Sequence, residues 1–287
     1  MPAKPRSDVS TRTRQPKLAY RDGRFMESPE GRTLRIGAEY LEPQARLQRA
    51  GVLNTIVFFG SARILPQEAA EERLKKLQDG AAQPEPSALR EAQTAVQMSR
   101  YYEDARQLAR MITEWSLALK RGSHFLVVCS GGGPGIMEAA NRGAFEAGGP
   151  SIGFNIKLPF EQSANPYVSP NLNFLFKYFF MRKLWFAQPA RALIVFPGGF
   201  GTMDELWEFL TLLQTRKMGH QCFILMYGSE YWKRVINIDA MAECGTVSQD
   251  DLRLARFVDS PEEAFEIIKR KLRRNRAMRA ALRHPFP

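Results

Sequence analysis

Residues 197–205 (PGGFGTMDE) constrain this chain most, because they place a glycine-rich turn and two acidic residues directly after an apolar run. That run, residues 192–196 (ALIVF), is typical of a strand buried on both faces of a parallel sheet. Ligands of open α/β sheets bind at the carboxyl ends of such strands. A helix beginning at Thr202 would direct free N–H groups and the positive end of its dipole toward an anion. The segment therefore predicts a phosphate site beside a carboxylate.

A second strand, glycine turn and helix are predicted earlier in the chain, where residues 124–129 lead into 130–135 (SGGGPG) and then into a helical pattern over 136–144. The turn lacks the Gly-Lys-Ser/Thr ending of a P-loop, and Ile136 stands where a dinucleotide fingerprint has its third glycine. The next predicted strand, 151–156, ends without the acidic residue that holds an adenosine ribose. These departures disfavour NAD binding and ATP hydrolysis.

Four ordered segments resemble the LOG family, specifically its longer bacterial members. This family contains cytokinin riboside monophosphate phosphoribohydrolases that were long labelled lysine decarboxylases. The resemblance extends from about residue 55 to residue 227, and its carriers are GGGPGIMEAANRGA at 131–144, NIKLPFEQ at 155–162, FFMRK at 179–183 and PGGFGTMDE at 197–205. The chain departs from the shorter plant-type enzymes at Phe180, where they have His, and at Asp204, where they have Glu.

The predicted site combines two catalytic side chains with a set of substrate and phosphate ligands. Glu205 is the carboxylate that would stabilise an oxocarbenium-like state and orient or deprotonate water. The resemblance implies that Arg182 orients the substrate and this acid. Close backbone approach at the glycines would hold the 5′-phosphate, and Glu138 is a candidate ribose ligand. The predicted binding residues are Ser61, Gly131, Gly132, Gly133, Gly135, Glu138, Lys183, Gly198, Gly199, Gly201 and Thr202.

Each of these side chains also has a purely structural interpretation. Thr202 and Glu205 have the spacing of a capping box, in which the acid bonds the N-cap amide. Asp204 would lie in the first turn of a helix, where acids favour the dipole. Arg182 and Lys183 could form a solvated pair, and Lys183 has no surrounding signature of a pyridoxal phosphate site.

Strand-like and helical segments alternate along the chain, which predicts a doubly wound, Rossmann-like α/β fold. We expect about six or seven parallel strands with helices on both faces. Residues 87–119 show a long helical pattern, whereas 66–86 are charged, contain glycine and prolines, and suggest an insertion or hairpin. We expect a basic, partly disordered extension over 1–48, a nucleotide-binding catalytic domain over 49–268, and a basic helix end and tail over 269–287.

The net charge of +11 does not indicate a nucleic-acid binder, because most of it lies at the ends of the chain. Residues 1–35 carry nine Lys/Arg against four acids, and 269–287 carry eight against none, so the intervening body is nearly neutral. We therefore expect no nucleic-acid partner; the alternative is a nucleic-acid binder that uses these basic ends. No run is long enough to span a membrane, the N-terminus has no apolar signal region, and three cysteines favour a reducing cytoplasm.

Metal catalysis is disfavoured, because the three histidines are scattered and no Cys or His pair has ligand spacing. We therefore expect neither a metal nor a cofactor. The predicted activity is hydrolysis of a purine nucleoside 5′-monophosphate, AMP or a cytokinin riboside monophosphate, to free base and ribose 5-phosphate. The alternative is a non-catalytic carrier or sensor of a nucleotide-like ligand, such as a molybdenum-cofactor carrier. The resemblance also implies a homodimer or higher homo-oligomer.

Overall fold

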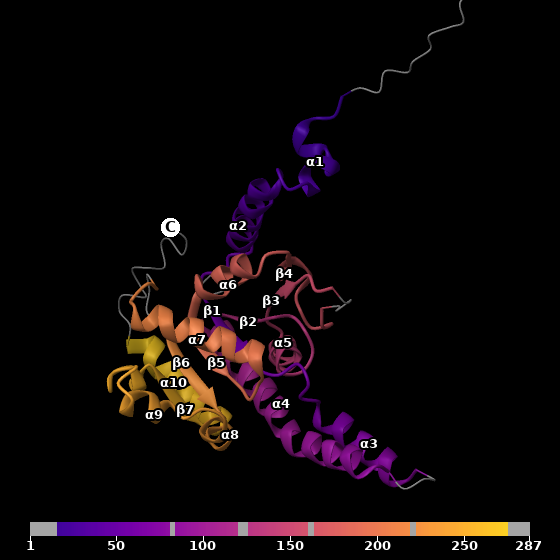
Figure 1. Cartoon of the computed structure of the whole chain (residues 1–287), viewed down its shortest axis with the longest axis vertical. Helices are drawn as coiled ribbons and strands as arrows, with labels where there is room; N and C mark the ends of the chain where they lie inside the picture. Colours follow the sequence, from indigo (N-terminus) through magenta and orange to yellow (C-terminus); the bar gives the residue numbers. More distant parts are fainter. Residues whose placement is uncertain (1–15, 81–83, 120–125, 160–163, 219–221, 275–287) are drawn as a thin grey trace, which may run out of the picture.

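The computed structural model describes residues 16–80, 84–119, 126–159, 164–218 and 222–274, and a parallel sheet forms its centre (Figure 1). Seven strands lie in the order β4-β3-β2-β1-β5-β6-β7, and all neighbouring pairs are parallel. The doubly wound α/β prediction is therefore confirmed. The strands are β1 Thr55–Phe59, β2 Val127–Ser130, β3 Ser151–Ile156, β4 Asn173–Phe176, β5 Ala190–Val195, β6 Phe223–Tyr227 and β7 Ala255–Val258.

The strand order places a topological switch point beside β1. The chain adds β2, β3 and β4 on one side of β1 and then crosses back, so that β5 pairs with the other side of β1. Phe59 at the carboxyl end of β1 is in register with Val195 at the carboxyl end of β5. The connections that follow these two strands leave in opposite directions, which opens a crevice for a ligand at this edge of the sheet.

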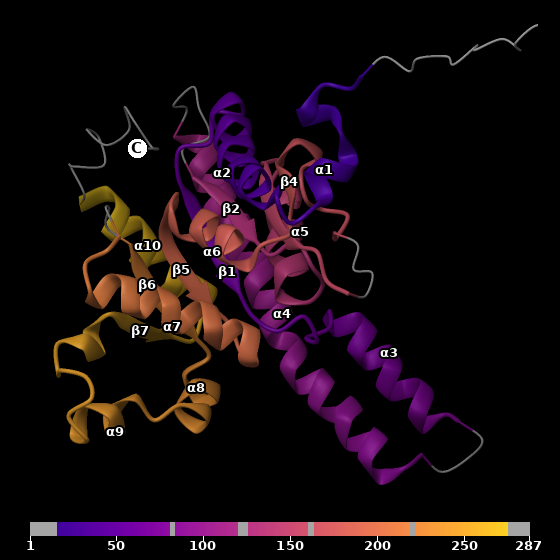
Figure 2. The same ribbon diagram turned by 45° about the horizontal axis from the view of Figure 1, so that its top comes forward.

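Helices cover both faces of the sheet (Figures 1 and 2). The α-helices of the described residues are α1 Gly23–Glu27, α2 Arg32–Arg49, α3 Gln67–Gln78, α4 Pro86–Ala118, α5 Ile136–Glu146, α6 Phe179–Ala187, α7 Phe200–Gln214, α8 Ser229–Val235, α9 Ile238–Glu243 and α10 Pro261–Arg274. Short 3-10 turns are found at Ala19–Arg21, Pro170–Leu172 and Asp251–Arg253.

Alternating side chains of β1 pack into two separate hydrophobic cores, one on each face of the sheet, because neighbouring residues of a strand point to opposite faces. Ile56 and Phe58 belong to the core under α4, α5 and α10. Val57 and Phe59 belong to the core under α2, α6, α7 and α8. All four side chains are buried, which explains why the strand is apolar without a polar alternation.

The helical pattern predicted over 87–119 is confirmed as α4, whose residues Tyr101, Ala105, Leu108 and Ile112 are buried in the core. Residues 66–86, expected to form an insertion or hairpin, contain the helix α3 at Gln67–Gln78, which forms a helical hairpin with α4. Only Ala70 of α3 is buried, so the sequence lacks the apolar stripe that identifies a helix. α3 lies along the first part of α4, and together they project beyond the sheet (Figure 2).

The predicted start of α7 at Thr202 is also wrong. The helix begins at Phe200, its N-cap is Gly199, and Thr202 lies within its first turn. The Thr202 side chain packs against Gly198, where an added Cβ would overlap it. Glu205 is therefore not the acid of a capping box, and its carboxylate is available for another role. Three segments lie outside the described residues: 120–125, which include the start of the strand predicted at 124–129; 160–163, which include the end of the NIKLPFEQ segment; and 275–287, which belong to the predicted basic helix end and tail.

No helix in the described ranges combines the length and the apolarity needed to cross a membrane.

Candidate active site

Three loops meet at the carboxyl edge of the sheet, after β1, β2 and β5. The Ser61 N–H donates to the Pro197 carbonyl at 3.0 Å, and the Ile136 N–H donates to the Ser61 carbonyl at 3.1 Å. Gly135 has a φ of +69°, and a Cβ there would overlap the backbone of Ser61 and Ala62. Glycine is required at this position both for its backbone conformation and for the close approach of the loops.

A cavity of about 530 Å³ opens where these loops meet α6 and α7. Its volume lies within the usual range for a small-ligand site. The first turn of α7 forms one wall, and the N–H groups of such a turn have no acceptor inside the helix. The lining includes the apolar side chains of Phe59, Met137, Phe179 and Phe200 and the polar or charged side chains of Ser61, Arg63, Arg182, Thr202, Asp204 and Glu205.

Glu205 is the buried acid of this cavity, with 4% of its surface exposed. Its Oε1 atom lies 3.9 Å from Arg182 Nη1. Its Oε2 atom is buried and has no hydrogen-bond partner among the described residues. Burial raises the pKa of Glu205 to about 7, against the opposing effects of the Arg182 and Lys183 charges. A carboxyl group with this pKa can exchange a proton near neutral pH.

Arg182 is held in place by contacts that leave its guanidinium beside Glu205. Its Nε donates to the Phe154 carbonyl at 2.6 Å, and its guanidinium carbon lies 5.0 Å from the centre of the Phe186 ring. Burial lowers the pKa of Arg182, and the Glu205 charge opposes that shift. Gly131 makes room for this arginine, because a Cβ there would lie 2.5 Å from Arg182 Nη2.

Lys183 faces two other acids of α7. Its Nζ lies 2.8 Å from Asp204 Oδ1 and 3.0 Å from Glu208 Oε2. Burial alone would lower the pKa of Lys183, but the hydrogen bonds to these two acids raise it above its ordinary value. The interpretation of Arg182 and Lys183 as one solvated pair is therefore not what the structure shows: their side chains diverge toward different acids.

The glycine loop 131–135 supports the site from behind rather than lining the cavity. Its four glycines are buried. The Gly132 N–H donates to Ser130 Oγ, and the Gly132 and Gly133 carbonyls accept from the Asn165 amide. None of Gly131, Gly132, Gly133 and Gly135 lines this cavity or the groove described below. Their predicted contact with phosphate stays a prediction.

The remaining predicted residues divide between the cavity and its surroundings. Gly199, Gly201 and Thr202 line the cavity. Gly198 instead lines a neighbouring groove, and its carbonyl accepts from the Tyr231 hydroxyl at 2.8 Å. Glu138 accepts from the Tyr102 hydroxyl at 2.8 Å and lines neither space.

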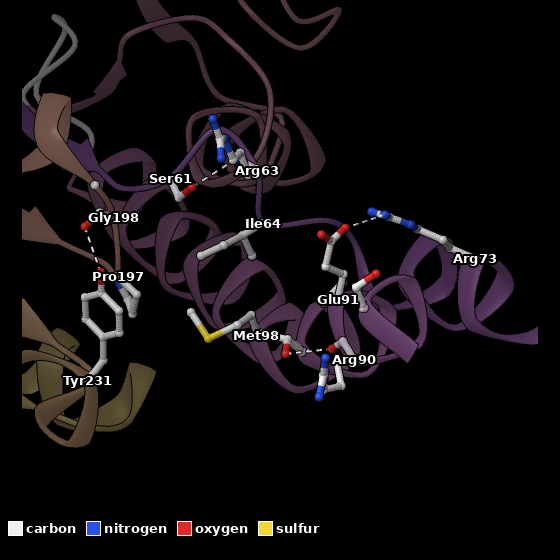
Figure 3. Close-up of a pocket in the computed structure, with 14 residues that line it drawn as sticks. Ser61, Arg63, Ile64, Arg73, Arg90, Glu91, Met98, Pro197, Gly198 and Tyr231 are labelled. Atoms are coloured by element: carbon white, nitrogen blue, oxygen red, sulfur yellow. Dashed lines mark hydrogen bonds and ion pairs between the residues drawn. The ribbon is translucent and has the colours of Figure 1, made fainter. Parts of the chain in front are cut away.

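The neighbouring groove has a volume of about 720 Å³ and lies between the first part of α4 and the loop after β5 (Figure 3). It shares Ser61, Arg63 and Gly199 with the cavity. Arg63 was not predicted although it lies two residues after Ser61, since an exposed basic residue in a loop carries no signal of its own. Phe200, which is 93% exposed at the first position of α7, was not predicted either.

No group of three or more His, Cys, Asp and Glu residues in the described parts of the chain is arranged to hold a metal ion. All three histidines, at positions 124, 220 and 284, lie outside those parts.

Comparison with known proteins finds a family model that matches part of the chain, including most of the residues that line the cavity. No curated protein matches the sequence. A structural-genomics target named TM1055 is 20% identical, covering 76% of this chain and 99% of its own, with a TM-score of 0.44. The Moco carrier protein from Chlamydomonas reinhardtii is 18% identical, covering 77% of this chain and 98% of its own, also with a TM-score of 0.44. The family model described as "Possible lysine decarboxylase" matches residues 137–268, which include all of α6 and α7. Over that segment the chain is similar to this family, and the resemblance to the LOG family is confirmed.

Proposed function

We propose that this protein hydrolyses the N-glycosidic bond of a purine nucleoside 5′-monophosphate and releases the free base and ribose 5-phosphate. The observation that carries the proposal is the state of Glu205. Its carboxyl group is buried, has a pKa of about 7, faces the cavity and has an oxygen that no described residue binds. A structural carboxylate is normally satisfied by its neighbours, because leaving a buried oxygen unpaired is costly.

The cavity offers a place for each part of the substrate. The N–H groups in the first turn of α7 and the Ser61 side chain would hold the 5′-phosphate, as helix N-termini do for anions. The ribose would then lie over Glu205. The apolar surfaces of Met137 and Phe179 would lie against the sugar and the base.

The reaction consumes one water molecule. The bond between the anomeric carbon and the base nitrogen breaks, and its electron pair leaves with the base, which takes up a proton. Ionised Glu205 stabilises the positive charge that develops on the ribose and accepts a proton from the attacking water. Arg182 keeps this carboxylate oriented and favours its ionised form.

The family description names a lysine decarboxylase, but the placement of Lys183 favours a hydrolase. A decarboxylase of that class needs a lysine that can form a Schiff base with pyridoxal phosphate. Lys183 is instead engaged by Asp204 and Glu208 and lines neither the cavity nor the groove. We also propose that residues 49–268 form the catalytic unit. The protein would assemble as a homodimer or higher homo-oligomer and would act in the cytoplasm.

The test is an assay of the full chain and of Glu205→Gln with AMP and with isopentenyladenosine monophosphate, in which free base and ribose 5-phosphate are quantified by chromatography. We expect release by the wild type and a loss of about a hundredfold or more in the variant. Glu266→Gln on the exposed surface of α10 is the matched control and should retain full activity. Absence of release from both nucleotides by folded wild-type protein would refute the hydrolase and favour non-catalytic ligand binding.

A further inference from the structure

The cavity and the groove meet at a single junction that contains a cation. Ser61, Arg63 and Gly199 line both spaces. Arg63 is exposed, and its backbone N–H donates to Ser61 Oγ at 3.1 Å. Figure 3 shows Ser61 and Arg63 together at one border of the groove, while Arg73 and Glu91 lie at another. The junction thus brings together Arg63, the Ser61 hydroxyl and Gly199, the N-cap of α7.

Most positive charge near Glu205 is already engaged. Arg182 lies beside Glu205 and donates to the Phe154 carbonyl. Lys183 binds Asp204 and Glu208. Among the described residues that line the cavity, Arg63 is therefore the cation that has no ion pair with an acid. A phosphate dianion entering this cavity needs a cation, and Arg63 is the one available to it.

Positively charged side chains also line the groove, which extends from the junction away from Glu205. Arg63, Arg73 and Arg90 line it together with one acid, Glu91. Arg73 pairs with Glu91 at 3.6 Å across exposed side chains, a pair that contributes little stability. Arg90 forms no ion pair with a described acid. The α3–α4 hairpin, which projects beyond the sheet, thus contributes guanidinium groups that match phosphate geometry.

We propose that Arg63 binds the 5′-phosphate at this junction and that the groove receives further phosphates of the same ligand. The catalytic cavity lies on one side of the junction and the groove on the other. A ribose directed toward Glu205 therefore directs the phosphate chain toward Arg90. Nucleoside di- and triphosphates then bind the site and compete with the monophosphate. The inference rests on the proposed function for the placement of the ribose.

The test measures binding by calorimetry in the full chain carrying Glu205→Gln, which prevents turnover. The probes are AMP, ADP, ATP and inorganic tripolyphosphate. We expect Arg63→Ala to weaken all four by about tenfold, because a charge-assisted hydrogen bond is lost. Arg90→Ala should weaken ADP, ATP and tripolyphosphate by at least about threefold and leave AMP unchanged, since only the longer chains reach it. Arg110→Ala, which removes an exposed arginine elsewhere on α4, should leave all four affinities unchanged.

The outcomes separate this inference from the proposed function. Unchanged AMP affinity in Arg63→Ala, or ADP and ATP binding about tenfold weaker than AMP in the parent, would overturn the inference and leave the hydrolase standing. If the affinities follow the expected pattern but the wild-type protein hydrolyses no nucleotide, the proposed hydrolase is refuted and the proposed anion site is supported. Competition of ATP with AMP in the wild-type assay provides a second, kinetic measurement.

Discussion

Glu205 and Arg182 lie side by side in the protein interior without a hydrogen bond between them. Their nearest charged atoms are 3.9 Å apart, and their side chains are only 6% and 13% exposed. That distance exceeds the range of a hydrogen bond, so the arginine supplies charge without saturating the acid. Desolvation consequently outweighs the attraction, and the pKa of Glu205 stays at about 7.

The first prediction concerns the pH dependence of turnover. If the ionised form of Glu205 is active, kcat/KM for AMP should rise with increasing pH and level off above about 7, where the carboxyl group is deprotonated. The rise should be tenfold per pH unit on the acidic limb. An initial-rate series from pH 5 to pH 9 at low substrate measures it. An activity that is already maximal at pH 5 would contradict this role of Glu205.

The second prediction concerns stability. The pKa of Glu205 rises from 4.5 to about 7 on folding, so the native state binds more protons than the unfolded state between these values. The free energy of unfolding therefore falls as pH rises through this window, with no penalty below 4.5 and the full penalty above 7. Glu205→Gln removes the penalty and should stabilise the protein at pH 8 by up to about 3 kcal/mol.

Urea denaturation of wild type and Glu205→Gln at pH 5 and pH 8 checks this prediction. Other carboxyl groups titrate alike in both proteins, so their effects cancel in the difference. Equal differences in unfolding free energy at the two pH values would show that Glu205 does not titrate in this window.

The third prediction concerns Lys183, whose charge lowers the pKa of Glu205 from outside the cavity. Lys183→Met removes that charge and leaves the negative charges of Asp204 and Glu208 uncompensated, and both acids raise the pKa of Glu205. The acidic limb of the pH profile should therefore move to higher pH. Lys75→Met, on the exposed surface of α3, is the control and should leave the profile in place. Lower activity with an unshifted profile would indicate a structural role only.

Some parts of this site can be predicted from the sequence and others cannot. The strands and glycine turns follow from short apolar runs and their positions, because these patterns depend on local burial. The start of α7 does not, since glycine and threonine both serve as N-caps, and the helix begins at Phe200 with Gly199 as its N-cap. That two-residue difference decides whether Glu205 caps a helix or faces the cavity.

Interactions between charged residues far apart in the chain were the hardest feature to predict from the sequence. The role predicted for Arg182 came from resemblance, because no local spacing shows that α6 and α7 bring it beside Glu205. Lys183 was expected among the substrate ligands, but the fold directs it to Asp204 and Glu208. Which of several basic residues keeps a free charge depends on where every acid lies, and only the folded chain provides that information.

The last prediction uses Gly131, which the sequence placed in a phosphate cradle and the structure places against Arg182. A Cβ at this position would lie 2.5 Å from Arg182 Nη2 and 2.6 Å from Met137 Sδ, the ends of two flexible side chains. Gly131→Ala should therefore fold, at a cost of about 1–3 kcal/mol for the overpacking. The guanidinium must move away from its present position, and displacements of this size at an active site reduce kcat/KM by up to about a hundredfold.

Two readouts separate displacement of Arg182 from a lost phosphate contact. Displacement weakens the charge that lowers the pKa of Glu205, so the acidic limb of the pH profile should move upward while the affinity for ribose 5-phosphate changes little. A lost phosphate contact would instead weaken ribose 5-phosphate binding and leave the profile unchanged. Gly37→Ala is the matched control. Gly37 lies on α2, and a Cβ there would meet no other atom within 4 Å, so this variant should preserve both the activity and the pH profile. Full activity of Gly131→Ala would show that the position of Arg182 beside Glu205 does not limit the reaction.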